Sequence, residues 1–132
     1  MKNAALIYNP NHGTIRLAYT ESGVGETYMG RHETYGVIEY SIIAAEPCTE
    51  AGLKFAKLIF EHRIKRLPKL KTAHETFEYR VREAIRFMTA LGKLSPAMQD
   101  LAYEKYSYLL QARRDARLEA EAIHTLHFLI QY

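Results

Sequence analysis

Histidines are the residues of this chain best suited to acid–base chemistry near neutral pH, and the sequence has six of them. His12 and His32 stand in two predicted loops, with Arg16, Tyr28 and Arg31 close to them in the sequence. A metal-independent ribonuclease needs a base, an acid and a cation around a phosphate, and these residue types can supply all three. The competing interpretation is that loops of a small sheet carry polar residues without any chemical role. The first 50 residues are also net acidic, which repels phosphate.

Metal binding and covalent catalysis are not expected. His124 and His127 are three residues apart on a predicted helix and could present both rings to one ion, but only Glu121 is near enough to add a carboxylate. We interpret the pair as capping carbonyls or lining an interface, and we expect no metal and no cofactor. The sequence has no HExxH, paired CxxC, P-loop or GxSxG motif. The lone Cys48 stands at a predicted helix start, where the helix dipole could lower its pKa, or it is a small semi-buried residue at a turn.

Positive charge is concentrated in one segment of the chain. Residues 51–71 contain seven Lys or Arg against one acid, whereas residues 1–50 contain three against six and residues 72–132 contain eight of each. Lys54, Lys57 and Lys65 share the polar arc of a predicted helix. Arg63 falls in the middle of the apolar arc of that helix, and Arg66 falls near its edge. Either the helix ends near residue 62, or these arginines meet an anionic partner.

Five cations within nine residues close this segment, at a density typical of a phosphate-contacting loop: Arg63, Lys65, Arg66, Lys69 and Lys71. We predict that they bind nucleic acid or a nucleotide phosphate. Two alternatives remain open, a solvated charge run and a docking surface for an acidic protein partner.

The elements that must position these residues follow from the spacing of apolar side chains. Strict alternation over Thr14–Thr20 and Gly36–Ile43 predicts strands, Ala4–Tyr8 is a shorter apolar run, and Glu26–Met29 is a weaker candidate. We expect these four short strands to form an antiparallel β-meander with one face wet. Because a sheet this small is not stable alone, helices should cover its other face.

Helical spacing begins after Pro47 and predicts three helices. Thr49 should cap the first, Thr72 the second, and Ser95 the third. Gly92 should end the second helix in the left-handed conformation.

The third predicted helix is long, because no glycine or proline follows Pro96. A helix of about 35 residues measures ~52 Å, and a compact domain of this size is about 36 Å across. The helix should therefore overhang its domain or bend near Arg113–Arg117. Small and apolar residues along one side favour an intermolecular helix contact over an intramolecular one; the predicted interface consists of Ala112, Ala116, Ala120, Ile123 and His127.

The composition, 48% apolar and 25% charged over 132 residues, indicates one α+β domain, with residues 1–46 as its sheet part and 47–132 as its helical part. No apolar run approaches the roughly 20 residues of a membrane span, and the single cysteine suits the cytoplasm. The leading hypothesis is a non-enzymatic homo-oligomer that binds nucleic acid or another phosphate-bearing ligand. The alternatives are an inhibitor or adaptor that blocks another protein, such as an accessory protein of a mobile element, and a small ribonuclease that uses His12 or His32.

Overall fold

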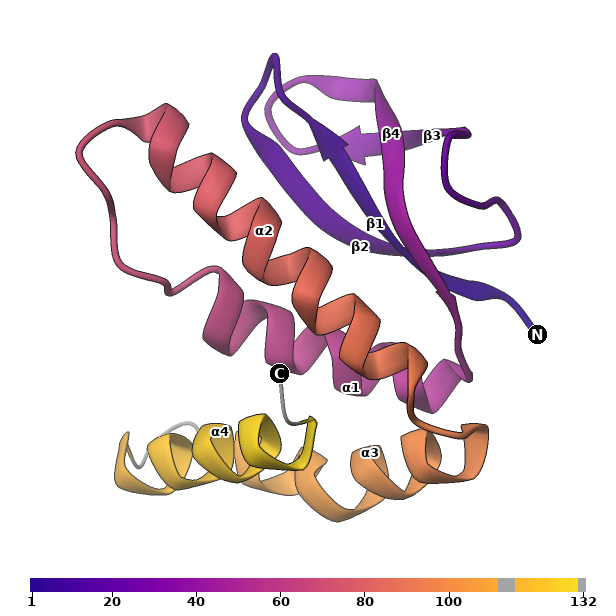
Figure 1. Ribbon diagram of the computed structural model, residues 1–132, viewed down its shortest axis with the longest axis vertical. Helices are drawn as coiled ribbons and strands as arrows, with labels where there is room; N and C mark the ends of the chain where they lie inside the picture. Colours follow the sequence, from indigo (N-terminus) through magenta and orange to yellow (C-terminus); the bar gives the residue numbers. More distant parts are fainter. Residues whose placement is uncertain (112–115, 131–132) are drawn as a thin grey trace.

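The computed structural model describes residues 1–111 and 116–130 and shows an α+β chain with its strands before its helices (Figure 1). The strands are β1 (Asn3–Asn9), β2 (Thr14–Thr20), β3 (Thr27–His32) and β4 (Gly36–Pro47). The helices are α1 (Glu50–Ile59), which continues into the π-helical turn η1 (Phe60–Ile64), and then α2 (Ala73–Gly92), α3 (Pro96–Gln111) and α4 (Ala116–Ile130). The predicted α+β class and the four antiparallel N-terminal strands are confirmed.

The strand order is β2-β1-β4-β3, which differs from the expected meander. The cause is the length of β4, which at 12 residues has room for two partners. Its first half, Gly36–Ser41, pairs with β3, and its second half, Ser41–Pro47, pairs with β1. Strand β1 therefore lies between β2 and β4, and β2 and β3 are left at the two edges.

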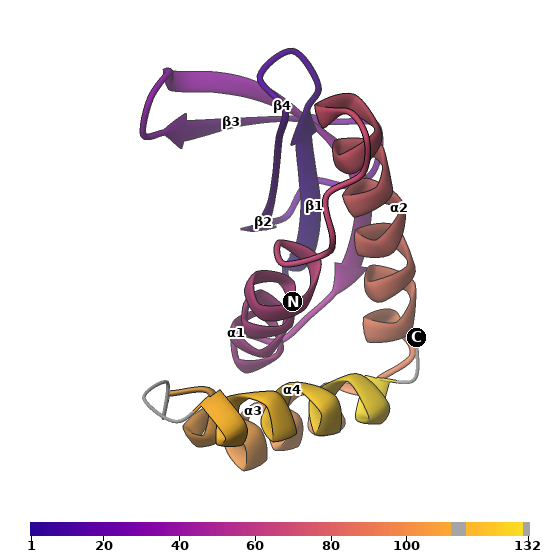
Figure 2. The ribbon, with the colours of Figure 1, turned by 90° about the vertical axis from the view of Figure 1, so that its left-hand side faces the viewer.

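Both faces of the sheet bury apolar side chains, because the sheet curls into a half-barrel. Ala4 and Leu6 face the main core beneath α1 and α2, whereas Ala5 and Ile7 join a smaller cluster on the opposite face. Figure 2 shows the hairpin of β3 and β4 reaching away from the helices. The expectation of one wet face is therefore met only along the outer part of this hairpin.

Three helix caps are confirmed. Thr49, Thr72 and Ser95 each accept a hydrogen bond from the backbone N–H three residues later, at 2.9, 3.0 and 3.2 Å. The prediction for Gly92 was wrong, because it is the last residue of α2 and is not among the glycines with positive φ. A Cβ at this position would overlap the carboxylate of Glu46, so the glycine leaves room for the Glu46 side chain in this position.

The prediction of a single long third helix was also wrong. Helices α3 and α4 lie side by side and run in opposite directions (Figures 1 and 2). The reason is hydrophobic: Ala122 and Leu126 of α4 are 1% and 0% exposed against the core, and a straight helix would leave such side chains in water. The overhang that favoured an intermolecular contact is therefore absent.

A buried glutamine fixes the start of α3 against the junction between β4 and α1. Gln99 is 1% exposed, and its side-chain oxygen accepts from the backbone N–H of Thr49 at 3.0 Å. Its amide nitrogen donates to the carbonyls of Pro47 and Leu94, at 3.4 and 3.3 Å. A Cβ on Gly52 would lie 2.5 Å from the side-chain oxygen of Gln99, so only glycine leaves room for this arrangement.

Candidate functional site

The π-helical turn explains why Arg63 does not fit the predicted helix. The backbone N–H of Lys65 donates to the carbonyl of Phe60, five residues earlier, at 3.0 Å. The wider turn changes the rotation of the side chains, so that His62 and Ile64 are buried and Arg63 is half-buried. Arg63 lies near α4, where burial first and then the charge of Arg63 lower the pKa of His127. Arg63 is thus part of the contact between η1 and α4.

Two of the five predicted cations, Lys69 and Lys71, meet at a hollow of about 400 Å³ between the tip of the β1–β2 hairpin and the start of α2. Arg80, on the second turn of α2, is the third cation that lines it. We call this site the basic hollow. Its lining also includes Gly13, Leu70 and Phe77. Sequence reasoning missed Arg80, although Thr72, Thr76 and Arg80 follow one another at intervals of four and so share one face of the helix.

The segment carrying the two lysines is held to α2 by hydrogen bonds. The backbone N–H of Leu70 donates to the hydroxyl oxygen of Thr76 at 2.8 Å, and this hydroxyl donates to the carbonyl of Thr72 at 2.9 Å. Thr76 is buried, so water does not compete for these bonds. Lys69 and Lys71, on either side of Leu70, are therefore attached to a backbone that is already fixed.

The electrostatic field of the basic hollow is positive. Among the residues that the structure describes, Lys69, Lys71 and Arg80 have no carboxylate within 4 Å. Glu75 is the acid nearest to the two lysines along the chain and borders a neighbouring hollow with them, and Glu78 is the acid nearest to Arg80. The Nε of Arg80 is buried and has no hydrogen-bond partner in the described part of the chain. The amino-terminal end of α2 adds partial positive charge. An anion entering here would satisfy groups that the fold leaves unpaired.

Lys65 borders a different hollow of about 330 Å³, beside η1. Arg16 and Lys57 add positive charge there, while Glu33 and Glu61 largely offset it. The ammonium of Lys65 lies 5.7 Å from the ring centre of Phe60. Arg66 is exposed, makes contacts of its own, and lines neither hollow. The predicted five-cation site is therefore divided between separate surfaces.

The structure brings the rings of His12 and His32 to the same tyrosine. The ring centres of His12 and Tyr35 are 4.0 Å apart, and those of His32 and Tyr35 are 4.7 Å apart. The Nδ1 of His32 accepts from the backbone N–H groups of Thr34 and Tyr35, at 3.0 and 3.4 Å. Because Nδ1 acts as an acceptor here, the ring can donate a hydrogen bond only through Nε2 in this arrangement.

The other candidate residues near these rings are used for structure. The guanidinium of Arg16 donates to the backbone carbonyl of Arg31 at 3.0 Å and so ties the edge strands β2 and β3 together. Tyr28 is half-buried and packs against the smaller core cluster. Of the two candidate cations, Arg16 is therefore engaged in a structural bond, whereas the side chain of Arg31 is exposed.

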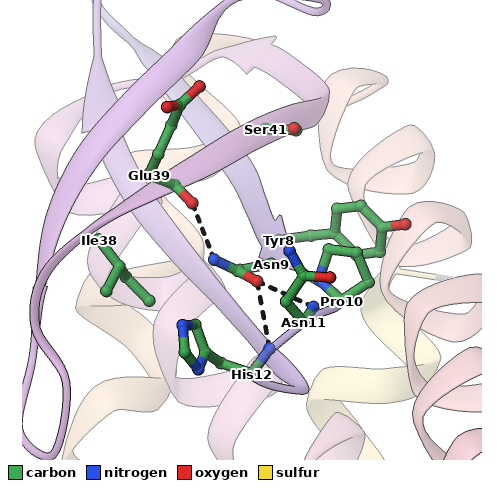
Figure 3. Close-up of a pocket in the computed structure, with 8 residues that line it drawn as sticks. All are labelled: Tyr8, Asn9, Pro10, Asn11, His12, Ile38, Glu39 and Ser41. Atoms are coloured by element: carbon green, nitrogen blue, oxygen red, sulfur yellow. Dashed lines mark hydrogen bonds between the residues drawn. The ribbon is translucent and has the colours of Figure 1, made fainter.

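His12 also borders an open hollow of about 520 Å³ (Figure 3). Asn9 occupies its centre: its amide nitrogen donates to the carbonyl of Glu39 at 3.0 Å, and its oxygen accepts from the N–H groups of Asn11 and His12 at 2.9 and 3.2 Å. The polar groups of this hollow therefore hold the β1–β2 turn against β4. No lysine or arginine is among its lining residues, so the hollow itself supplies no cation to a phosphate.

The residues predicted for an oligomer interface are placed differently from one another. Ala112 lies outside the described residues, Ala116 is the first residue of α4, and Ala120 is exposed. Ile123 packs against the core of its own chain, and His127 is half-buried near Arg63. Ala122, Ile123 and Leu126 of α4 therefore face the core of their own chain, whereas Leu118 and Phe128 of the same helix are exposed.

Cys48 is buried, and burial together with the charge of Asp100 raises its pKa to about 12. The structure therefore supports the interpretation of Cys48 as a small residue at a turn and not as a reactive thiol, since an uncharged thiol is a poor nucleophile. Within residues 1–111 and 116–130, no three His, Cys, Asp or Glu side chains are grouped as metal ligands. No helix in the same ranges is long and apolar enough to cross a membrane.

Comparisons with protein-family models, with curated proteins and with solved structures found no match.

Proposed function

We propose that this chain binds nucleic acid through the basic hollow. The observation that carries the proposal is the convergence of Lys69, Lys71 and Arg80, from a loop and a helix, around one concavity without a carboxylate in contact. Phosphate oxygens are the natural partners of such a group, because arginine offers paired donors and lysine a compact charge. The backbone of Leu70 is already held by its hydrogen bond to Thr76. This supports the proposal, because a binding site that is ordered in advance loses less entropy when its ligand binds.

A matched pair of arginines on α2 tests the proposal. Arg80 lines the basic hollow, whereas the exposed Arg82 lies about 200° further around the same helix. Binding of a fluorescein-labelled 20-nucleotide RNA, followed by anisotropy at 50 mM salt, should be weakened about 10-fold by Arg80→Gln and little changed by Arg82→Gln. Equal effects would mean that only net charge matters. Absence of binding by the parent would leave the inhibitor or adaptor hypothesis in first place.

RNA cleavage is a second candidate, favoured by the approach of His12 and His32 to one tyrosine. His12 would take the proton of a ribose 2′-hydroxyl as its oxygen bonds to the adjacent phosphorus. It would return that proton to the 5′-oxygen as the phosphorus–oxygen bond breaks, giving a 2′,3′-cyclic phosphate and a 5′-hydroxyl. The Nε2–H of His32 would donate to a phosphate oxygen.

Incubation of labelled RNA with the protein in a chelator tests this activity. Cyclic-phosphate ends that disappear with His12→Ala, while binding persists, would support it. Intact RNA after prolonged incubation would remove it and leave the binding proposal untouched.

A further inference from the structure

The basic hollow has an apolar lining as well as cations, and this indicates what kind of nucleic acid enters it. Leu70, between the two lysines, is 42% exposed although it is hydrophobic. Phe77 is half-buried and lines the hollow on the α2 side. A surface that contacts only the backbone of a duplex gains little from exposed apolar side chains, because the bases of a duplex are stacked inside it.

We propose that the ligand of the basic hollow is a single strand, with one unstacked base against Leu70 and Phe77 and its phosphate toward Lys69, Lys71 and Arg80. This inference rests on the proposed binding of nucleic acid. Proteins that bind single strands combine a positive groove with aromatic side chains on which bases stack, and the hollow has both parts side by side. Its volume of about 400 Å³ also lies within the range of pockets that enclose small ligands.

The ring of Phe77 is held in place from behind. It stacks on Tyr8 of β1, with ring centres 5.9 Å apart and an angle of 11° between the planes. The sheet therefore supports the ring that a base would contact, just as Thr76 supports the backbone of Leu70. Opposite them, nothing lies within 4 Å of the position of a Cβ on Gly13, so the hairpin tip leaves that side of the hollow open.

Arg80 also favours a phosphate in the hollow, because its buried Nε has no hydrogen-bond partner among the described residues. A buried donor without a partner is unfavourable, and a phosphate oxygen is an acceptor of the right charge. Arg80 and Phe77 are three residues apart on α2, so the two side chains are neighbours on the helix surface. A nucleotide likewise has its anionic phosphate close to its flat base, so the two could lie against Arg80 and Phe77 respectively.

The test compares labelled oligo-uridine of 12 residues with a duplex RNA of the same length at one salt concentration. Phe77→Leu keeps the site apolar but removes the ring, and it should weaken binding of the single strand about 5- to 100-fold, with the duplex unchanged. Because Phe77 also packs on Tyr8, the exposed Leu70→Ser is the second variant, and it should weaken the single strand selectively without affecting folding. Leu101→Ser, exposed on α3, is the control and should change neither.

Two results would overturn the inference by different routes. Equal or tighter binding of the duplex, or equal losses for both ligands in Leu70→Ser, would show that bases do not enter the hollow while leaving nucleic-acid binding intact. Failure of the parent to bind either RNA at low salt would remove the proposed function itself.

Discussion

Salt dependence gives the sharpest measure of phosphate contacts at Lys69 and Lys71. Each phosphate neutralised on a single strand releases counterions and contributes about −0.7 to the slope of log K against log salt. The double substitution Lys69→Gln/Lys71→Gln removes two such contacts, so the slope should become shallower by about 1.4. Between 50 and 200 mM salt, a fourfold change, this difference amounts to a factor of about 7. The variant should therefore lose about 7 times more affinity, relative to the parent, at 50 mM than at 200 mM.

The control must remove the same net charge elsewhere. Arg82→Gln/Lys93→Gln does so at two exposed positions of the α2 region, and Lys93 lies about 20 Å along the helix from Arg80. Fluorescence anisotropy over five salt concentrations gives the slope for the parent and for both variants. Their melting curves should coincide, because all four side chains are exposed.

The result that refutes the reasoning is a slope that the two double variants change equally. The lysines would then act only through the net charge of the chain, and the segment would be a solvated face or a docking surface for a protein. A changed sequence preference in Lys69→Gln/Lys71→Gln would point instead to contacts with base edges.

Four further outcomes follow from the described contacts. Cys48 should resist a thiol-reactive disulfide reagent at pH 8 in the native protein and react at once in denaturant, because burial raises its pKa to about 12; rapid reaction of the folded chain would contradict this. Gly52→Ala should destabilise the chain by about 1–3 kcal/mol in urea unfolding, since the added methyl overlaps Gln99, and an unchanged midpoint would show that the junction can relax. The lowered pKa of His127, caused by burial and by Arg63, contributes stability above about pH 6.5 that is lost as the pH falls through the lowered value. The melting temperature of His127→Gln should therefore fall less than that of the parent between pH 7 and pH 5. Equal decreases in the two proteins would contradict this. Self-association through α4 stays a prediction: light scattering should give at least twice 15.3 kDa, and Ala120→Glu, at an exposed position, should restore the single-chain mass.

Local signals in the sequence predicted the elements well, because strands and caps depend on neighbouring residues. The alternation of Thr14–Thr20 reproduces β2, and the threonines at 49 and 72 cap the helices that they were expected to cap. Features that depend on distant contacts were missed. Gly92 looks like a helix-ending glycine, yet what lies against it is the carboxylate of Glu46, which is 46 residues away. The partner of β1 is the far half of β4, and no turn signal shows that pairing.

The candidate site shows the same limit in its charges. Arg63 and Lys69 belong to one basic run in the sequence, but the π-helical turn directs Arg63 toward α4 and the loop directs Lys69 toward the β1–β2 hairpin. Charge density along the chain therefore marks a basic segment but does not identify which of its cations lie together. Arg80 replaces Arg63 in the cluster because the helix that follows the loop folds back over the sheet, which places its second turn beside Lys69 and Lys71. If phosphate binding is the role of this surface, Arg80→Gln must weaken it more than Arg63→Gln does at equal net charge.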